Sequence, residues 1–156
     1  GHRHRVPGGF FYTKDAGITW KESADLKNEP IHALAQSNKD PNILVAGGDG
    51  KVFISYNKGE NWKKLTDEKV AFIKQFVDSA AFDPSNSNTI YIGTTWRPYK
   101  SIDGGKTWKL ISKGMIDDSD VFAVDVDPKS PDHIVASACS GIYETYNGGE
   151  LWSKIQ

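Results

Sequence analysis

The sequence predicts an all-β protein, a β-propeller of four-stranded antiparallel sheets, on three observations. A tryptophan-terminated stretch recurs four times, ending at Trp20, Trp62, Trp108 and Trp152, at intervals of 42, 46 and 44 residues. Short apolar runs lie between turns of Asp, Pro, Asn and Gly, which is typical of strands. Helical periodicity is nearly absent, with one exception at residues 67–76. A period in the forties carried by strands indicates propeller blades.

Each complete repeat reads as four strands in chain order. A turn rich in Asp and Pro separates the first two strands, and the tryptophan-terminated stretch separates the last two. In one complete repeat the predicted strands fall near residues 76–82, 89–94, 98–102 and 107–112. The first repeat has room for only the last two strands, near residues 9–13 and 19–23.

The predicted organisation is therefore one propeller domain of about three and a half blades. Its parts are a half blade over residues 1–26, which includes an N-terminal HRHR loop, and blades over residues 31–66, 76–112 and 120–156. An incomplete ring leaves unpaired strand edges, which invite pairing with another chain. We expect either a fragment of a longer propeller or a chain that completes itself by homo-oligomerisation.

The recurring stretch has the chemistry of a tight turn with a hydrophobic anchor. Its first position carries a hydroxyl, at Thr13, Ser55, Ser101 and Thr145. Its third position carries a carboxylate or amide that can accept backbone N–H groups, at Asp15, Asn57, Asp103 and Asn147. Its fifth position is a glycine that tolerates positive φ, at Gly17, Gly59, Gly105 and Gly149. We expect each tryptophan to bury its ring between neighbouring sheets.

The pattern S/T-x-D/N-x-G-x-T-W resembles the Asp-box, or BNR, repeat. The cadence DPxxPxxIYxGT followed by KSxDGGKTW is most similar to photosystem II stability/assembly factor-like proteins and to bacterial BNR-repeat, sialidase-like proteins. Two boxes carry Asn for Asp, and Asn61 and Leu151 replace the usual Thr. The resemblance implies that the box is a structural turn remote from any catalytic centre. It also favours an extracellular or periplasmic location, although the residues themselves leave the compartment undetermined.

Composition excludes several function classes. The chain has 38% hydrophobic and 12% aromatic residues, enough to furnish a core. A net charge of -1 removes the broad electrostatic attraction on which nonspecific nucleic-acid binding depends. No apolar run is long enough to span a bilayer. The boxes lack the spacing of a calcium loop, so we expect no metal, and nothing indicates a cofactor. Cys139 has no histidine spaced as a catalytic partner.

Candidate ligand-binding residues fall in the loops that share one face of a propeller. Trp96 and Arg97 form the most informative pair, because a ring beside a guanidinium suits stacking on a sugar or a partner side chain. Asp49 lies in the corresponding loop of the preceding repeat. The N-terminal loop adds a cationic group, His2, Arg3, His4 and Arg5. Two plainer alternatives remain open: Trp96 caps a blade, and the N-terminal segment is a loosely ordered end or a tag remnant.

Two functions follow from these observations. The first is a non-catalytic module for protein interaction or assembly, with no catalytic residues. The alternative is part of an Asp-box glycoside hydrolase that acts on or binds polysaccharide, which requires two carboxylates flanking the scissile bond. Asp49, Asp78 and Asp117 are available, but nothing around them marks a pair. With only three arginines the chain does not match a sialidase, and whether it is an enzyme stays open, with the balance against catalysis.

Overall fold

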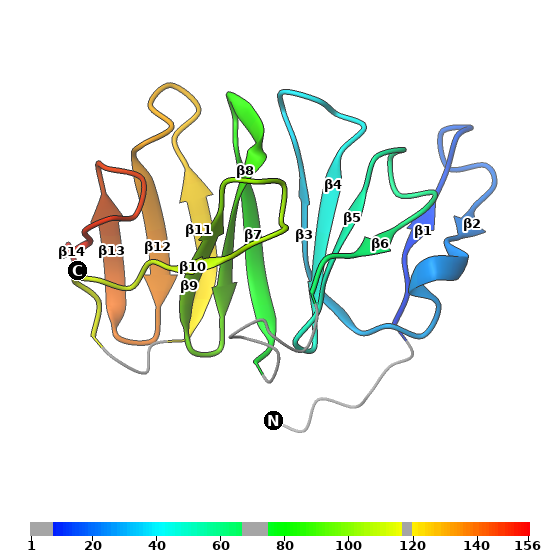
Figure 1. Ribbon diagram of the computed structural model, residues 1–156. Coiled ribbons are helices and arrows are strands. Elements are labelled where there is room, and N and C mark those ends of the chain that lie inside the picture. Colours follow the sequence, from blue (N-terminus) through cyan, green and yellow to red (C-terminus); the bar gives the residue numbers. More distant parts are fainter. Residues whose placement is uncertain (1–7, 67–74, 117–119) are drawn as a thin grey trace.

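The computed structural model describes residues 8–66, 75–116 and 120–156 (Figure 1). In these residues the chain forms three four-stranded antiparallel sheets and one two-stranded sheet, which stand side by side as a fan. The predicted all-β, partial β-propeller is thereby confirmed. The segment with helical periodicity, residues 67–76, lies mostly outside the described residues, and so do Asp117 and the N-terminal group from His2 to Arg5.

In each four-stranded sheet the strands follow chain order from an inner strand to an outer strand, and the two-stranded sheet consists of the two strands that flank its box. The first sheet pairs β1 (Phe11–Tyr12) with β2 (Lys21–Glu22) and is followed by a 3-10 turn, η1 (Ala24–Leu26). The second sheet comprises β3 (Ile31–Gln36), β4 (Leu44–Gly48), β5 (Val52–Ser55) and β6 (Lys63–Lys64). The third comprises β7 (Val77–Asp83), β8 (Asn86–Thr94), β9 (Arg97–Ser101) and β10 (Lys109–Leu110). The fourth comprises β11 (Val121–Val126), β12 (Ile134–Ala138), β13 (Gly141–Thr145) and β14 (Ser153–Lys154).

Two strands of the third sheet, β8 and β10, differ from their predicted bounds. Strand β8 begins three residues before the predicted start, because Asp83 and Asn86 pair across the turn after a register shift. The outer strand β10 is only two residues long, since the box turn occupies the chain up to Trp108. The second strand of this sheet is therefore longer than the sequence predicts, and the outer strand is shorter.

Three apolar clusters hold adjacent sheets together. The first joins the two-stranded sheet to the second sheet through Phe10, Leu26, Leu44, Ala46, Phe53 and Trp62. The next, between the second and third sheets, includes Ala33, Val45, Val52, Val77, Phe82, Ile90 and Ile92. The last, between the third and fourth sheets, includes Tyr91, Ile111, Val121, Ile134, Tyr143 and Trp152. The core thus consists of sheet-to-sheet interfaces, as in sheets stacked around an axis.

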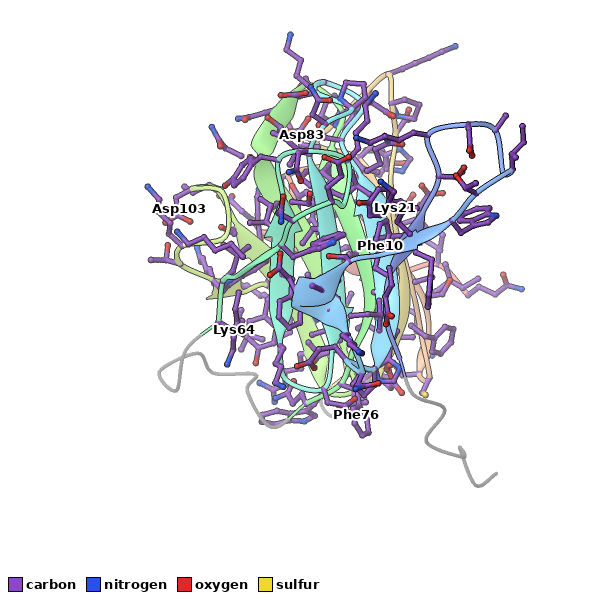
Figure 2. The ribbon with its side chains drawn as sticks, turned by 90° about the vertical axis from the view of Figure 1, so that its right-hand side faces the viewer. Phe10, Lys21, Lys64, Phe76, Asp83 and Asp103 are labelled. Atoms are coloured by element: carbon purple, nitrogen blue, oxygen red, sulfur yellow. The ribbon has the colours of Figure 1, made fainter. Side chains whose placement is uncertain are left out.

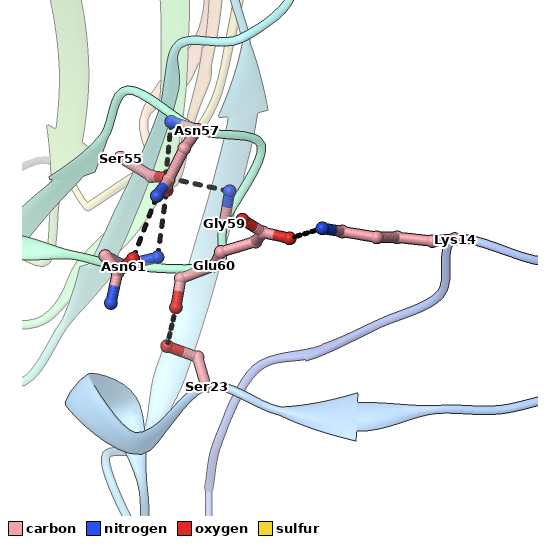
Figure 3. Close-up of polar contacts among 7 residues, drawn as sticks. All are labelled: Lys14, Ser23, Ser55, Asn57, Gly59, Glu60 and Asn61. Carbon is pink, nitrogen blue, oxygen red and sulfur yellow. Dashed lines mark hydrogen bonds and ion pairs between the residues drawn. The ribbon is translucent and has the colours of Figure 1, made fainter.

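Each box turn uses the same set of hydrogen bonds, shown for the second sheet in Figure 3. The Ser55 hydroxyl donates to Asn57 Oδ1 at 3.0 Å and accepts the Gly59 N–H at 2.8 Å. Asn57 Oδ1 accepts the Asn61 N–H at 2.9 Å. Gly59 has φ of 90°, where a side chain would be strained. The small and polar residues of the box are therefore turn-forming residues whose partners lie inside the same turn.

The expectation that every box tryptophan is buried between sheets is wrong for the first one, and Trp108 is only partly buried. Trp62 and Trp152 are only 8% and 2% exposed, whereas Trp20 is 61% exposed. Trp62 packs on Phe10 of the preceding sheet, and the Trp152 Nε1–H donates to the Ile111 carbonyl at 2.6 Å. Because each box packs on the sheet before it in the chain, the box of the first described sheet has no such surface beneath it.

Candidate functional site

The loops between second and third strands gather on one side of the fan, the lower side in Figure 1, opposite the box turns. Figure 2 shows Phe76 at this lower end and Asp83 at the upper end. We use the name Phe76 cluster for five residues on this side, His32, Asp49, Phe76, Trp96 and Arg97. They come from the second and third sheets and from the segment that joins them.

Trp96 and Arg97 are fixed by the tight turn between β8 and β9. The Thr94 hydroxyl accepts the Trp96 N–H at 3.0 Å and donates to the Arg97 carbonyl oxygen at 2.8 Å. Arg97 has φ of 98°, which is unusual for a residue with a side chain. In this conformation the Arg97 guanidinium carbon lies 4.4 Å from the centre of the Trp96 ring, a cation–π contact. The Trp96 ring remains 41% exposed.

Phe76 connects this turn to the neighbouring sheet. Its carbonyl accepts the Thr95 N–H at 3.0 Å, and its own N–H donates to the Thr95 hydroxyl at 3.3 Å. Phe76 also forms an isolated antiparallel bridge with Asp49. The backbone of Phe76 therefore ties the β4–β5 loop to the β8–β9 turn, while its ring stays 47% exposed.

His32 and Asp49 form the polar half of the cluster. The His32 Nε2 atom lies 2.6 Å from Asp49 Oδ1. The His32 ring also packs edge-on against Phe76, with centroids 5.6 Å apart and 73° between the planes. The cluster thus contains two exposed aromatic rings, of which Trp96 contacts the Arg97 guanidinium and Phe76 contacts the hydrogen-bonded His32. It therefore combines exposed apolar surface with nearby charged groups.

The structure brings three of the sequence candidates, Asp49, Trp96 and Arg97, into one neighbourhood. It also adds Phe76 and His32, which the sequence did not single out. Phe76 closes a segment with helical periodicity, and His32 begins an apolar strand run, so neither had a local signal of exposure. Only the bridge between Asp49 and Phe76, a contact across two sheets, places them at the surface together.

A second polar cluster lies in the fourth sheet, around His133. Its Nδ1 atom is 3.3 Å from Asp127 Oδ2, and its Nε2 atom is 3.2 Å from Glu144 Oε2. The ring stacks on Tyr146 with centroids 4.5 Å apart. Hydrogen bonds to Asp127 and then Glu144 raise the pKa of His133. The cluster ties the turn after β11 to strand β13, which is a structural role.

Two absences hold for the described ranges only, 8–66, 75–116 and 120–156. Within them, no group of three or more His, Cys, Asp or Glu side chains is placed to hold a metal ion. Within them, too, there is no helix of the length and apolarity needed to cross a membrane. Cys139 is a free, exposed thiol in the loop after β12.

Comparison with known proteins identifies the repeat. The family model described as BNR/Asp-box repeat matches residues 11–22 and 99–110. Sortilin from Danio rerio is 32% identical over 103 residues, which covers 65% of this chain and 12% of sortilin. The chain therefore spans only about an eighth of the length of this curated relative.

Solved structures share the fold at low identity. The GH74 xyloglucanase from Xanthomonas campestris superposes with a TM-score of 0.77 at 16% identity, over 96% of this chain and 27% of that one. YCF48 bound to D1 peptide superposes with a TM-score of 0.63 at 16% identity, over 80% of this chain and 40% of that one. The repeat match, the sheet arrangement and these superpositions together show that the chain carries BNR/Asp-box repeats and has the fold of a partial β-propeller.

Proposed function

We propose that the chain is a non-catalytic protein-interaction module whose binding surface is the Phe76 cluster. The observation that carries the proposal is the placement of two exposed rings, Phe76 and Trp96, beside the Arg97 guanidinium. Aromatic and arginine side chains are enriched among the residues that dominate binding energy at protein interfaces. Backbone contacts hold Phe76 against Thr95 and Asp49, so the backbone there is ordered before binding and loses little conformational freedom.

The partner that suits this surface is an extended peptide segment or an exposed loop of another protein. Its apolar side chain would contact Phe76 and Trp96, and its polar groups would meet Arg97 or Asp49 at the ends of the cluster. YCF48, which shares the fold, has been solved with a peptide bound. The proposal also includes assembly: the exposed Trp20 leaves one end of the fan open to association with another copy of the chain.

A second candidate is recognition of polysaccharide, as part of an Asp-box glycoside hydrolase. The observation that favours it is the same Trp96 ring, whose exposed face suits stacking on a sugar. A GH74 xyloglucanase shares the fold. Both candidates use Trp96, but the first predicts binding of a peptide and the second predicts binding of an oligosaccharide. Measuring both kinds of binding separates them.

The test is a selection of peptides from a displayed library on the purified chain, alongside titration with xyloglucan oligosaccharides. We expect selected peptides to lose about 30-fold in affinity on Trp96→Ala, which corresponds to about 2 kcal/mol. Arg97→Gln should weaken the same peptides. Tyr56→Ala is the matched control, because Tyr56 is an exposed aromatic in the second box turn. Peptides that bind the wild-type chain and the Trp96→Ala variant equally would overturn the proposal, and binding of oligosaccharide alone would favour the second candidate.

A further inference from the structure

At every junction between sheets in the described chain, the box of one sheet seats on the sheet before it. A β-carbon added to Gly59 would lie 2.2 Å from the Phe10 ring, and one added to Gly105 would lie 2.4 Å from Leu65. One added to Gly149 would lie 2.7 Å from Ile111. Each sheet thus has a box face, which carries the box and its tryptophan, and a receiving face, on which the next box seats.

Within the described residues, the box face of the first sheet is open. Phe11 and Trp20 stand nine residues apart, as do Phe53 and Trp62 in the second sheet. Phe53 is 6% exposed, whereas Phe11 is 56% exposed. A β-carbon on Gly17 would approach only the Trp20 ring of its own turn, at 3.9 Å. Two large apolar rings whose counterparts in the second sheet, Phe53 and Trp62, are buried are therefore uncovered here.

The receiving face of the fourth sheet is likewise left uncovered by the described part of the chain, and its outer half is apolar. Ile155 follows its box tryptophan by three residues, as Leu65 and Ile111 do. Ile111 is 6% exposed beneath Gly149, whereas Ile155 is 52% exposed. Ile142 on β13 stands at the position that Phe10 holds beside Gly59, ten residues before the box tryptophan. This half of the face keeps the chemistry on which boxes seat.

The inner half of the same face departs from the repeat. Ser137 occupies the position that Gly47 and Gly93 hold in their own sheets. Gly47 pairs with Ala33, Gly93 pairs with Ser79, and Ser137 pairs with Ala123. The two glycines leave room for the first strand of the next sheet. A β-carbon on Gly47 would lie 2.3 Å from Val77, and one on Gly93 would lie 2.3 Å from the Val121 carbonyl. Ser137 fills that room.

A second substitution in the inner half agrees with the first. Asp125 pairs with Val135 at the position where Ala35 and Ala81 pair with their partners. Asp125 is exposed. A charged side chain is costly to cover with an apolar strand. The receiving face of the fourth sheet therefore suits a neighbour that has outer strands and a box but no inner strands, and the sheet β1–β2, as the described residues form it, is such a neighbour.

We infer that two copies of this chain associate head to tail, with Phe11 and Trp20 of one copy seated on Ile142 and Ile155 of the other. The inference rests on the assembly part of the proposed function and names its two surfaces. Because the surfaces differ, the contact is heterologous, and each copy keeps one of each for a further contact. Apolar area that is buried at the internal junctions would be buried in the same way between copies.

The experiment is light scattering coupled to size-exclusion chromatography over a range of concentrations. The wild-type chain should associate, and Trp20→Ala or Ile155→Asp should each weaken association at least about tenfold, typical of a central apolar contact. Circular dichroism should show both variants folded, because both side chains are exposed. Ile102→Asp is the matched control, an exposed isoleucine away from both surfaces, and should leave association unchanged.

A mixture of the two variants gives the sharpest outcome. The Trp20→Ala copy keeps an intact receiving face, and the Ile155→Asp copy keeps an intact box face. Mixing them should restore one junction and give a 1:1 heterodimer. A wild-type chain that stays monomeric at every concentration would overturn the inference, and so would association that neither variant weakens. Failure of the association test would leave the peptide-binding proposal for the Phe76 cluster standing. The peptide test depends on Trp96, which neither the Trp20→Ala nor the Ile155→Asp variant changes.

Discussion

The ring of Phe10 packs edge-on against the indole of Trp62, with centroids 5.1 Å apart and 69° between the planes. This contact joins the first sheet to the second across the Gly59 box corner, where Phe10 leaves no room for a β-carbon. At the other internal junctions the box glycines Gly105 and Gly149 approach Leu65 and Ile111 of the preceding sheet, so the box is both a turn and the point at which one sheet packs on another.

Gly59→Ala should therefore destabilise the fold much more than Gly17→Ala. Both glycines have φ near 90°, so backbone strain costs about 1 kcal/mol at either position. At Gly59 the added methyl also meets the Phe10 ring, which adds about 2 kcal/mol of overpacking. Urea denaturation of the two variants measures the difference. Equal losses would show that Gly59 is required only for its backbone conformation.

Trp152→Phe should destabilise the chain, whereas Trp20→Phe should have almost no effect. The buried Trp152 Nε1–H donates to the Ile111 carbonyl, and a phenyl ring would leave that acceptor without its donor. The expected cost is about 1 to 3 kcal/mol. Thermal unfolding of both variants, at a concentration where the chain is monomeric, checks the prediction. A Trp20→Phe variant as unstable as Trp152→Phe would contradict it.

Acid should loosen two of the four box corners. The Thr107 hydroxyl donates to Asp103 at 2.5 Å and, with the Thr107 N–H, lowers the pKa of the carboxyl to about 2. A lowered pKa means that the stabilisation is present above the ordinary value of 3.8 and is lost as the pH falls through about 2. Asp15, with the Thr19 hydroxyl as its main partner, behaves in the same way.

Hydrogen exchange at single amides tests this with internal controls. Protection of the Thr19 and Thr107 amides, corrected for intrinsic rate, should fall between pH 3.8 and about 2. The amides of Asn61 and Leu151 donate to Asn57 and Asn147, which do not titrate, and should keep their protection. Loss at all four amides together would contradict the prediction.

His133 should titrate above its ordinary pKa of 6.5, because Asp127 and then Glu144 stabilise its charged form. The stabilisation is complete below pH 6.5 and is lost as the pH rises through the higher pKa of the folded state. Titration followed by NMR should give a midpoint that falls on Asp127→Asn or Glu144→Gln. Glu150→Gln, an exposed carboxylate of the same sheet, is the control. A midpoint unchanged by all three variants would contradict the assigned contacts.

The sequence predicted the sheets well because the box is a local structure. Its hydroxyl, its carboxylate or amide, and its glycine make their hydrogen bonds within five residues, so spacing alone locates each corner. The Trp20 exposure was not predictable in this way. A box tryptophan is buried by the sheet before its own, and no sheet precedes the first one within the described residues.

The candidate site was predicted only in part for a related reason. Trp96 and Arg97 adjoin in sequence, so their contact has a local signal. Phe76 reaches Asp49 and Thr95 through contacts between separate sheets, whose register follows from packing rather than from any short pattern. Residues that meet only across a junction leave no trace in the periodicity of one repeat.

At each internal junction, a box packs on the sheet before it in the chain. The most direct test of this packing is oxidative footprinting of the five tryptophans in dilute protein, read residue by residue by mass spectrometry. If each box seats on the sheet before it, Trp62 and Trp152 should be modified slowest, and the exposed Trp20 and Trp96 fastest. Modification of Trp62 or Trp152 as fast as that of Trp96 would contradict the arrangement of sheets on which the proposed surfaces depend.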